Sequence, residues 1–146
     1  MLFVCTGYDS PTLVAIRPEG AKGDVTESHV AWRLKKAVPH NPSPLLLDDA
    51  LYLVSDKGVV TCLEARTGKE RWQERIGGEF SASPVYADGK IFLQNETGDG
   101  IVLRPGAKYE ELARNALGER SLASYAVGDG ALFVRTERHL ARLQEK

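Results

Sequence analysis

The side chains best suited to chemistry in this sequence are the oxygen-bearing groups of a glycine-rich segment near its centre. Residues 95–100 read NETGDG, which places amide and carboxylate oxygens among glycines that let backbone carbonyls turn inward. Calcium binds about six to eight such oxygens. A solvated β-turn is the alternative for this segment. With two further carboxylates to complete the shell and calcium as the cofactor, the predicted metal ligands are Glu96, Asp99, Asp9 and Asp56.

His40 is the predicted catalytic residue. It lies between Pro39 and the pair Asn41-Pro42, so a rigid loop would hold its side chain in place. A histidine exchanges protons near neutral pH and can act as a general base toward water. A structural or solvated role is the alternative for His40.

The remaining residues exclude several classes of function. The sequence contains no G-x-S-x-G elbow, phosphate-binding loop or dinucleotide-binding glycine motif. Cys5 and Cys62 stand far apart in apolar runs, which indicates buried hydrophobic residues rather than a redox or metal pair. With 19 basic and 20 acidic residues the net charge is −1, so there is no electrostatic reason to expect nucleic acid or an anionic membrane as a partner.

The elements that must position these side chains belong to a repeat of about 40 residues. The run SPLLLDDALYLVS begins at Ser43, SPVYADGKIFLQN begins at Ser83, and SYAVGDGALFVR begins at Ser124. Because the three serines recur with the repeat, we assign them to the geometry of the repeating unit and not to catalysis.

Short β-rich runs separated by tight turns predict strands throughout the chain. Asp88-Gly89 and Asp129-Gly130 lie between apolar runs and predict type I′ hairpin turns. The best-defined unit divides into four strands, at about 43–48, 50–56, 58–66 and 69–76, as is typical of a propeller blade. The sequence therefore predicts an all-β fold, a partial β-propeller of about three and a half four-stranded blades with 14 strands.

The predicted domain organisation leaves two strand edges open. We expect residues 1–146 to form a single partial propeller domain, with blades at about 1–38, 43–76, 83–115 and 122–143. The first unit lacks its innermost strand and the last unit lacks its outermost strand, so both would present unpaired backbone groups. Two copies related by a two-fold axis could complete the ring, which predicts a homodimer.

Residues 62–72 read CLEARTGKERW, and Trp32 precedes Trp72 by one period of 40 residues. This pattern resembles the repeat of PQQ-like β-propellers of the quinoprotein-dehydrogenase type, which runs Leu-x-Ala-x-Asp-x-x-Thr-Gly-Lys-x-x-Trp, and the chain looks like a C-terminal fragment of that family. The resemblance implies that both tryptophans pack between neighbouring blades. The family's quinone site needs a cysteine pair, a catalytic carboxylate and calcium ligands that this sequence does not match, so we do not expect PQQ as a cofactor.

Two hypotheses for the function follow from the resemblance. The first is a PQQ-like propeller module that binds a small ligand or a protein partner without quinone catalysis. The alternative, by analogy with other propeller enzymes, is a calcium-dependent hydrolase that opens lactones such as acyl-homoserine lactones. Calcium would polarise the carbonyl while His40 or a carboxylate activates water. If the chain is an enzyme, this lactonase is favoured over a quinoprotein dehydrogenase.

The expected partners and cellular address follow from the same observations. A small-molecule ligand and a second copy of the chain are the expected partners, and we expect neither nucleic-acid binding nor membrane insertion. Members of the family are commonly periplasmic or secreted. Residues 1–5 read as a strand and not as a signal peptide, because they lack a basic segment and a long apolar stretch.

Overall fold

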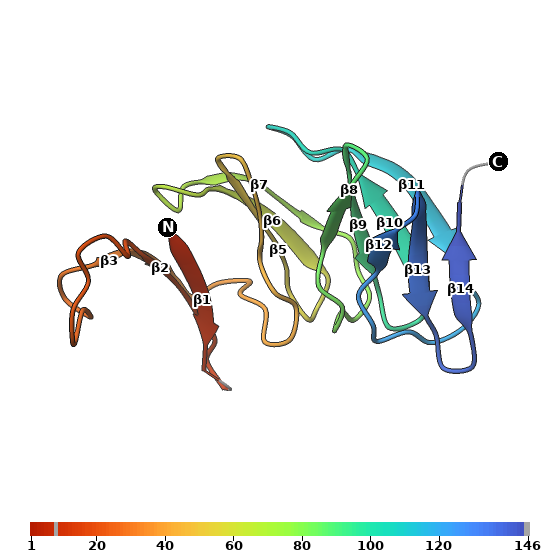
Figure 1. Cartoon of the computed structure of the whole chain (residues 1–146), viewed down its shortest axis with the longest axis horizontal. Coiled ribbons are helices and arrows are strands. Elements are labelled where there is room, and N and C mark those ends of the chain that lie inside the picture. Colours follow the sequence, from red (N-terminus) through yellow and green to blue (C-terminus); the bar gives the residue numbers. More distant parts are fainter. Residues whose placement is uncertain (8, 145–146) are drawn as a thin grey trace.

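The computed structural model describes residues 1–7 and 9–144. Within these residues the strands form four antiparallel sheets of three, four, four and three strands, which confirms the predicted all-β partial propeller. The sheets follow one another in chain order across the molecule, with the first and the last at opposite ends (Figure 1). The strands are β1 (Leu2–Thr6), β2 (Thr12–Ile16), β3 (Val30–Leu34), β4 (Leu45–Leu47), β5 (Ala50–Val54), β6 (Val59–Glu64), β7 (Glu70–Arg75), β8 (Val85–Ala87), β9 (Lys90–Gln94), β10 (Asp99–Leu103), β11 (Glu111–Ala116), β12 (Ala126–Gly128), β13 (Ala131–Arg135) and β14 (Leu140–Leu143).

Tight turns join the short inner strand of a sheet to the strand beside it. Asp48, Asp88 and Asp129 adopt positive φ angles of 52°, 46° and 49° at these turns. Aspartate tolerates this left-handed conformation better than most residues, and a type I′ turn requires it. In the turn after β4 only Asp48 has a positive φ, because Asp49 stands where the other two turns have a glycine with positive φ. The Asp-Gly signal therefore predicted these hairpins correctly.

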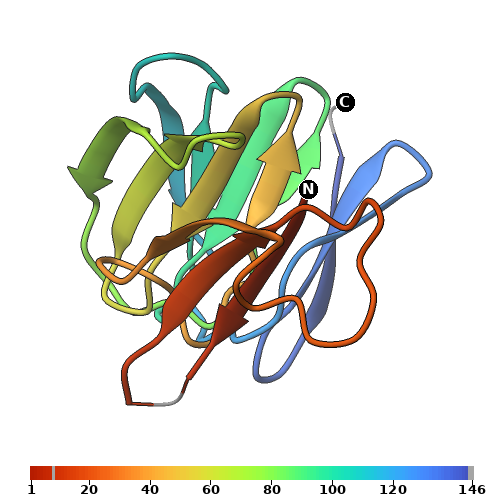
Figure 2. The ribbon, with the colours of Figure 1, turned by 90° about the vertical axis from the view of Figure 1, so that its left-hand side faces the viewer.

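The core consists of apolar layers between neighbouring sheets, because central strands such as β5 and β6 bury both of their faces. Tyr52 and Val54 of β5 point toward the third sheet and join a buried cluster with Ile91 and Leu93. Side chains on the opposite face of β5 pack against the first sheet, together with Leu13. Figure 2 shows the sheet of β1–β3 in front with the later sheets stacked behind it.

Both cysteines are free thiols, as expected for small apolar residues of this core. Cys62 is buried between the second and third sheets, and Cys5 is half-buried beside the second sheet. Burial raises the pKa of each thiol above its ordinary value, which keeps both in the unreactive protonated form at neutral pH.

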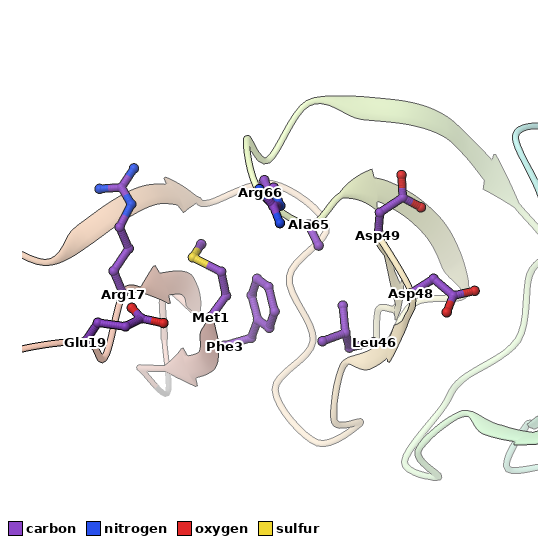
Figure 3. A pocket seen from close by; sticks show the side chains of 9 residues that line it. All are labelled: Met1, Phe3, Arg17, Glu19, Leu46, Asp48, Asp49, Ala65 and Arg66. Carbon is purple, nitrogen blue, oxygen red and sulfur yellow. The ribbon is translucent and has the colours of Figure 1, made fainter.

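A cavity of about 800 Å³ opens where the first sheet faces the turn between β4 and β5. Its walls include Phe3 of β1 and Leu46 of β4, which point toward the same space, with Arg66 at one side (Figure 3). β1 pairs with β2 only and forms the end of its sheet. The cavity therefore borders a strand edge that no described residue covers.

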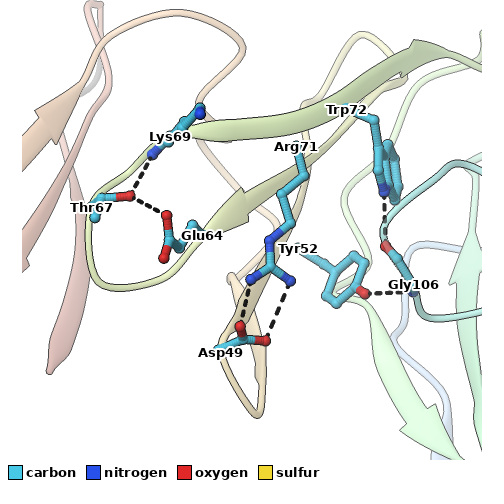
Figure 4. A network of polar contacts seen from close by, with 8 residues as sticks. All are labelled: Asp49, Tyr52, Glu64, Thr67, Lys69, Arg71, Trp72 and Gly106. Carbon is cyan, nitrogen blue, oxygen red and sulfur yellow. Dashed lines mark hydrogen bonds and ion pairs between the residues drawn. The ribbon is translucent and has the colours of Figure 1, made fainter.

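Tryptophans hold neighbouring sheets together at the outer strands, as the resemblance implied. The indole Nε1 of Trp32 donates to the carbonyl of Ala65 at 3.1 Å, and Nε1 of Trp72 donates to the carbonyl of Gly106 at 3.0 Å. The second of these bonds, together with the bond from the Gly106 amide to the Tyr52 hydroxyl, is drawn in Figure 4. An added Cβ at Gly68 would lie 2.6 Å from the Trp32 ring, so only glycine fits below this indole.

The repeating serines connect the inner strands of successive sheets. The backbone N–H of Ser43 donates to the hydroxyl of Ser83 at 2.9 Å, and the N–H of Ser83 donates to the hydroxyl of Ser124 at 2.8 Å. Ser83 and Ser124 therefore each accept a hydrogen bond from the serine one repeat earlier. These two hydrogen bonds link successive sheets, which is the structural role predicted for the serines.

Candidate functional site

Four of the predicted site residues, His40, Asp56, Glu96 and Asp99, lie on one face, on turns inside the sheets or on connections between sheets. Each connection is hydrogen-bonded to such a turn. Phe80 donates its backbone N–H to the carbonyl of Asp56, and Ser121 donates to the carbonyl of Glu96, at 3.1 and 3.2 Å. The N–H of Glu137 donates in the same way to the carbonyl of Arg120, at 2.9 Å. We call this surface, which comprises residues 38–41, 55–58, 77–81, 95–99, 118–122 and 136–139, the loop face.

The structure brings His40 and Asp56 together through the backbone. One carboxylate oxygen of Asp56 accepts the backbone N–H of His40 at 2.7 Å. The other accepts the backbone N–H and the side-chain amide of Asn41, at 3.2 and 2.8 Å. The carboxylate of Asp56 thus anchors the connection that leads from β3 to β4.

Glu96 has the equivalent role in the following repeat. Its carboxylate accepts the hydroxyl of Ser81 at 2.5 Å, and its other oxygen lies 3.6 Å from the guanidinium of Arg120. Ser81 belongs to the connection before β8 and Arg120 to the connection before β12. Glu96 therefore joins two connections that lie on either side of its own turn.

Asp99 forms its hydrogen bonds within its own turn. Its carboxylate accepts the side-chain amide of Asn95 at 3.0 Å, while the backbone N–H of Asp99 donates to the Asn95 side-chain oxygen at 2.7 Å. A Cβ at Gly98, where φ is +96°, would lie 2.0 Å from the carbonyl of Glu119. Gly98 is therefore required by the close approach of the next connection, which explains this glycine without a bound cation.

The structure does not gather the predicted ligands into one site. Asp9 lies exposed between β1 and β2, and no contact between described residues joins it to Asp56, Glu96 or Asp99. Across residues 1–7 and 9–144, no group of three or more His, Cys, Asp or Glu side chains is arranged to hold a metal ion. The assignment of calcium ligands and of a catalytic role for His40 stays a prediction.

One polar cluster on the loop face was missed in the sequence. Glu119 accepts the hydroxyl of Thr136 at 2.6 Å, and its other oxygen lies 2.7 Å from Nδ1 of His139. The hydrogen bond from Thr136, with a smaller contribution from His139, holds the pKa of the Glu119 carboxyl below its ordinary value. The repeat specifies the position of each segment in its blade, but it carries no information on which side chains of different segments meet.

None of the described elements is a helix with the length and apolar character needed to span a membrane.

The family model and the relatives that match this chain carry the same description. A family model described as outer membrane protein assembly factor BamB matches residues 22–108, more than half of the chain. The outer membrane protein assembly factor BamB of Burkholderia pseudomallei (strain K96243) is 32% identical over 95 residues, which cover 64% of this chain and 24% of that protein. The BamB of Marinobacter adhaerens (strain DSM 23420 / HP15) is 28% identical over 101 residues, 69% of this chain and 25% of that protein. The chain thus spans about a quarter of the length of these relatives.

Solved structures share the fold at low sequence identity. BamB from Moraxella catarrhalis superimposes with a TM-score of 0.73 at 18% identity, covering 97% of this chain and 42% of that one. A quinohemoprotein alcohol dehydrogenase from Pseudomonas putida HK5 gives a TM-score of 0.62 at 14% identity, covering 90% of this chain and 26% of that one. These likenesses show the propeller fold and not an activity. With the family model matching over more than half of its length, the chain belongs to the BamB family of PQQ-like repeat propellers.

Proposed function

We propose that this chain is a non-catalytic propeller module that binds a protein partner during outer membrane protein assembly. The observation that carries the proposal is the use of the loop-face carboxylates. Asp56 and Glu96 each hold a connection between sheets through short hydrogen bonds. A face whose loops are held in this way is preformed, and a preformed surface loses little conformational entropy when a partner binds.

The chemistry of the loop face suits a protein partner. Leu122 is 47% exposed and borders a shallow pocket of about 190 Å³ with Arg120 and Glu137. Arg120 lies 4.0 Å from Glu137, and on the turn of the second sheet Lys57 lies 3.6 Å from Glu79. An apolar centre with a rim of both charge signs is typical of interfaces between proteins. The names of the relatives indicate where such a partner is found, namely among the proteins that assemble the outer membrane.

Site-specific photo-crosslinking in the bacterium tests this proposal. A photoreactive amino acid replaces Leu122 on the loop face, or Leu112 on β11 as the control, since Leu112 is also exposed at 37% but lies on an outer strand. We expect position 122 to cross-link to an outer membrane protein or to another assembly factor, and position 112 to give no such product. Equal cross-linking at both positions, or none at 122, would overturn the assignment of the loop face.

Two predictions from the sequence are tested separately. The lactonase would open acyl-homoserine lactones with added calcium and lose this activity with a chelator; no opening under either condition rejects it.

The homodimer through the open edges would give twice the chain mass in light scattering at micromolar concentration, and a monomeric mass contradicts it. By its family, the module would act outside the cytoplasm, at the outer membrane.

A further inference from the structure

One hydrogen-bond donor on the loop face is present in two repeats and absent from the next. The residue two positions before each repeating serine is Asn41, Ser81 or Leu122. The side-chain amide of Asn41 donates to the Asp56 carboxylate at 2.8 Å, and the hydroxyl of Ser81 donates to the Glu96 carboxylate at 2.5 Å. A leucine side chain has no donor, so Leu122 cannot make this bond.

Glu137 is the carboxylate that would have accepted the missing bond. Its backbone N–H donates to the carbonyl of Arg120 at 2.9 Å, as the N–H of Glu96 donates to the carbonyl of Glu79 at 2.8 Å. The two glutamates are therefore equivalent in the repeat. No described residue donates a hydrogen bond to the Glu137 carboxylate, and the Arg120 guanidinium lies 4.0 Å from it, beyond hydrogen-bond distance.

The charges around Glu137 favour a cation as its partner. Arg120 lies between two carboxylates, 3.6 Å from Glu96 and 4.0 Å from Glu137. Together with Glu119 and Arg138, the group contains three carboxylates and two guanidinium groups, so it keeps an excess of one negative charge. An ionised carboxylate only accepts hydrogen bonds, and those from cationic donors are about twice as strong as bonds between neutral groups.

An apolar surface lies beside this carboxylate. Leu122 is exposed and borders the same shallow pocket as Glu137. The two segments that form the pocket are hydrogen-bonded to each other, because the hydroxyl of Ser121 donates to the carbonyl of Arg135 at 2.8 Å and Glu137 donates to Arg120. A position that gives up a structural hydrogen bond and exposes an apolar side chain is typical of a functional site.

We propose that the protein partner places a lysine or arginine side chain on the Glu137 carboxylate and an apolar side chain of the same segment on Leu122. The basic group supplies the donor that Asn41 and Ser81 supply within the earlier repeats. This inference rests on the proposed function, because it specifies the chemistry of the partner that binds the loop face. The contact is centred on the connection before β12 and the turn after β13.

Photo-cross-linking from position 122, combined with substitutions of Glu137, tests the inference. Glu137→Gln keeps the shape of the side chain but removes its charge, and it should reduce the yield of cross-linked partner by about tenfold, as the loss of a charge-assisted hydrogen bond implies. Glu137→Asp keeps the charge and should retain most of the yield. The matched control is Glu70→Gln, because Glu70 is also exposed but lies on the outer strand β7; it should leave the yield unchanged.

Arg120→Gln tests the opposite contact, in which a carboxylate of the partner binds the guanidinium. We expect this variant to leave the yield unchanged or to raise it, because it removes a cation that competes for Glu137. A loss of yield in Arg120→Gln without a loss in Glu137→Gln would assign the contact to a carboxylate of the partner and overturn the inference.

Mass spectrometry of the cross-linked peptide identifies the chemistry of the partner directly. We expect a lysine or arginine within about three residues of the cross-linked site, since an extended chain covers about 3.3 Å per residue. A cross-linked site with neither residue nearby contradicts the inference.

The failure of this inference can be told apart from the failure of the proposed function. No product from position 122 in the chain without other substitutions overturns the proposed function, and the inference with it. A product whose yield is the same in Glu137→Gln supports the proposed function and overturns only the basic contact on Glu137.

Discussion

The junction between the second and third sheets and the junction between the third and fourth occupy the same place in the repeat, yet their chemistry differs. At the first junction Val54 pairs with Val60 across β5 and β6, and both are fully buried in an apolar cluster. The Trp72 indole and the Tyr52 hydroxyl then fasten this junction to Gly106 (Figure 4).

At the second junction the equivalent pair is Gln94 and Gly100, across β9 and β10. Tyr125, which stands where the earlier repeats have proline, donates its hydroxyl to the side-chain oxygen of Gln94 at 2.5 Å. A Cβ at Gly100 would lie 2.5 Å from that hydroxyl. The glutamine, glycine and tyrosine of this repeat therefore depend on one another: the hydroxyl of Tyr125 needs Gln94 as its acceptor and needs the space left by Gly100. They replace an apolar contact with a buried hydrogen bond.

The largest expected effect comes from restoring the valine of the first junction alone. Gly100→Val puts a side chain where the Tyr125 hydroxyl lies. Overpacking of this kind should lower the free energy of unfolding by about 3 kcal/mol, measured by urea denaturation. The triple variant with Gln94→Val and Tyr125→Pro copies the first junction completely and should recover most of the loss. Wild-type stability of Gly100→Val alone would show that the three positions are not coupled.

Removing the indole from the first junction should be the next largest effect. By the strand register the third repeat has Ala113 at the position of Trp72, because Ala113 pairs with Val102 as Trp72 pairs with Cys62. Trp72→Leu therefore makes the two junctions more alike at this site, since neither then has an indole. The variant loses the bond to Gly106 and the ring contacts with Tyr52 and Tyr109. We expect a loss of about 2 kcal/mol in chemical denaturation. Leu112→Ala, on an exposed outer strand, is the control and should change stability by less than about 1 kcal/mol.

A smaller effect separates the two tyrosine hydroxyls. Tyr125→Phe leaves the oxygen of buried Gln94 without its donor and should reduce stability by about 1.5 kcal/mol. Tyr52→Phe removes the acceptor of the Gly106 amide. Because this amide is more exposed and water can accept its hydrogen bond, the free energy of unfolding should fall by only about 0.5 kcal/mol. Thermal unfolding of both variants measures the difference. An equal loss in both would mean that burial does not distinguish the two junctions.

The pH dependence of the Tyr125→Phe effect follows from titration of the hydroxyl. Burial raises the pKa of Tyr125 to about 12, above the value of about 10 in an unfolded chain. Because the folded pKa is the higher one, the protonated hydroxyl contributes its full stability below about pH 10 and loses it as the pH rises toward 12. The stability gap between wild type and Tyr125→Phe should therefore shrink over this range, as measured by urea denaturation at each pH.

The smallest expected difference between matched variants concerns the serine chain that runs along both junctions. Ser83→Ala and Ser124→Ala each remove an acceptor of a backbone N–H and should reduce stability by about 1 kcal/mol. Ser43→Ala removes a hydroxyl that accepts no bond from a described residue and should change stability by less than about 0.3 kcal/mol. Equal losses in all three, compared by urea denaturation, would indicate that the hydroxyls act through something other than this chain of bonds.

Much of the fold could be predicted because its signals are local. The Asp-Gly turns and the short β-rich runs between turns predicted the strands and their number within the described residues. The Trp period predicted contacts between blades, which Trp32 and Trp72 make.

The candidate site was less predictable because its contacts are between side chains of different repeats. The residue types predicted Asp56 and Glu96 as calcium ligands, which stays a prediction. They could not show that backbone amides of residues 40–41 and the hydroxyl of Ser81 donate to these carboxylates. The repeat places Asp56 and Glu96 one full period apart, 40 residues. This spacing is a signal for a structural role, and it was available in the sequence.

The sequence by itself determined the all-β class, the length of the repeat and the positions of the tight turns, because each depends on residues close together in the chain. Only the tertiary structure decided which polar groups are already paired with one another. Those outcomes depend on atoms brought together from distant repeats, as when Tyr125 reaches Gln94 or when the connection near Glu119 closes on Gly98. Periodicity specifies the position of a residue in its blade, whereas the packing of the blades determines which residues it contacts.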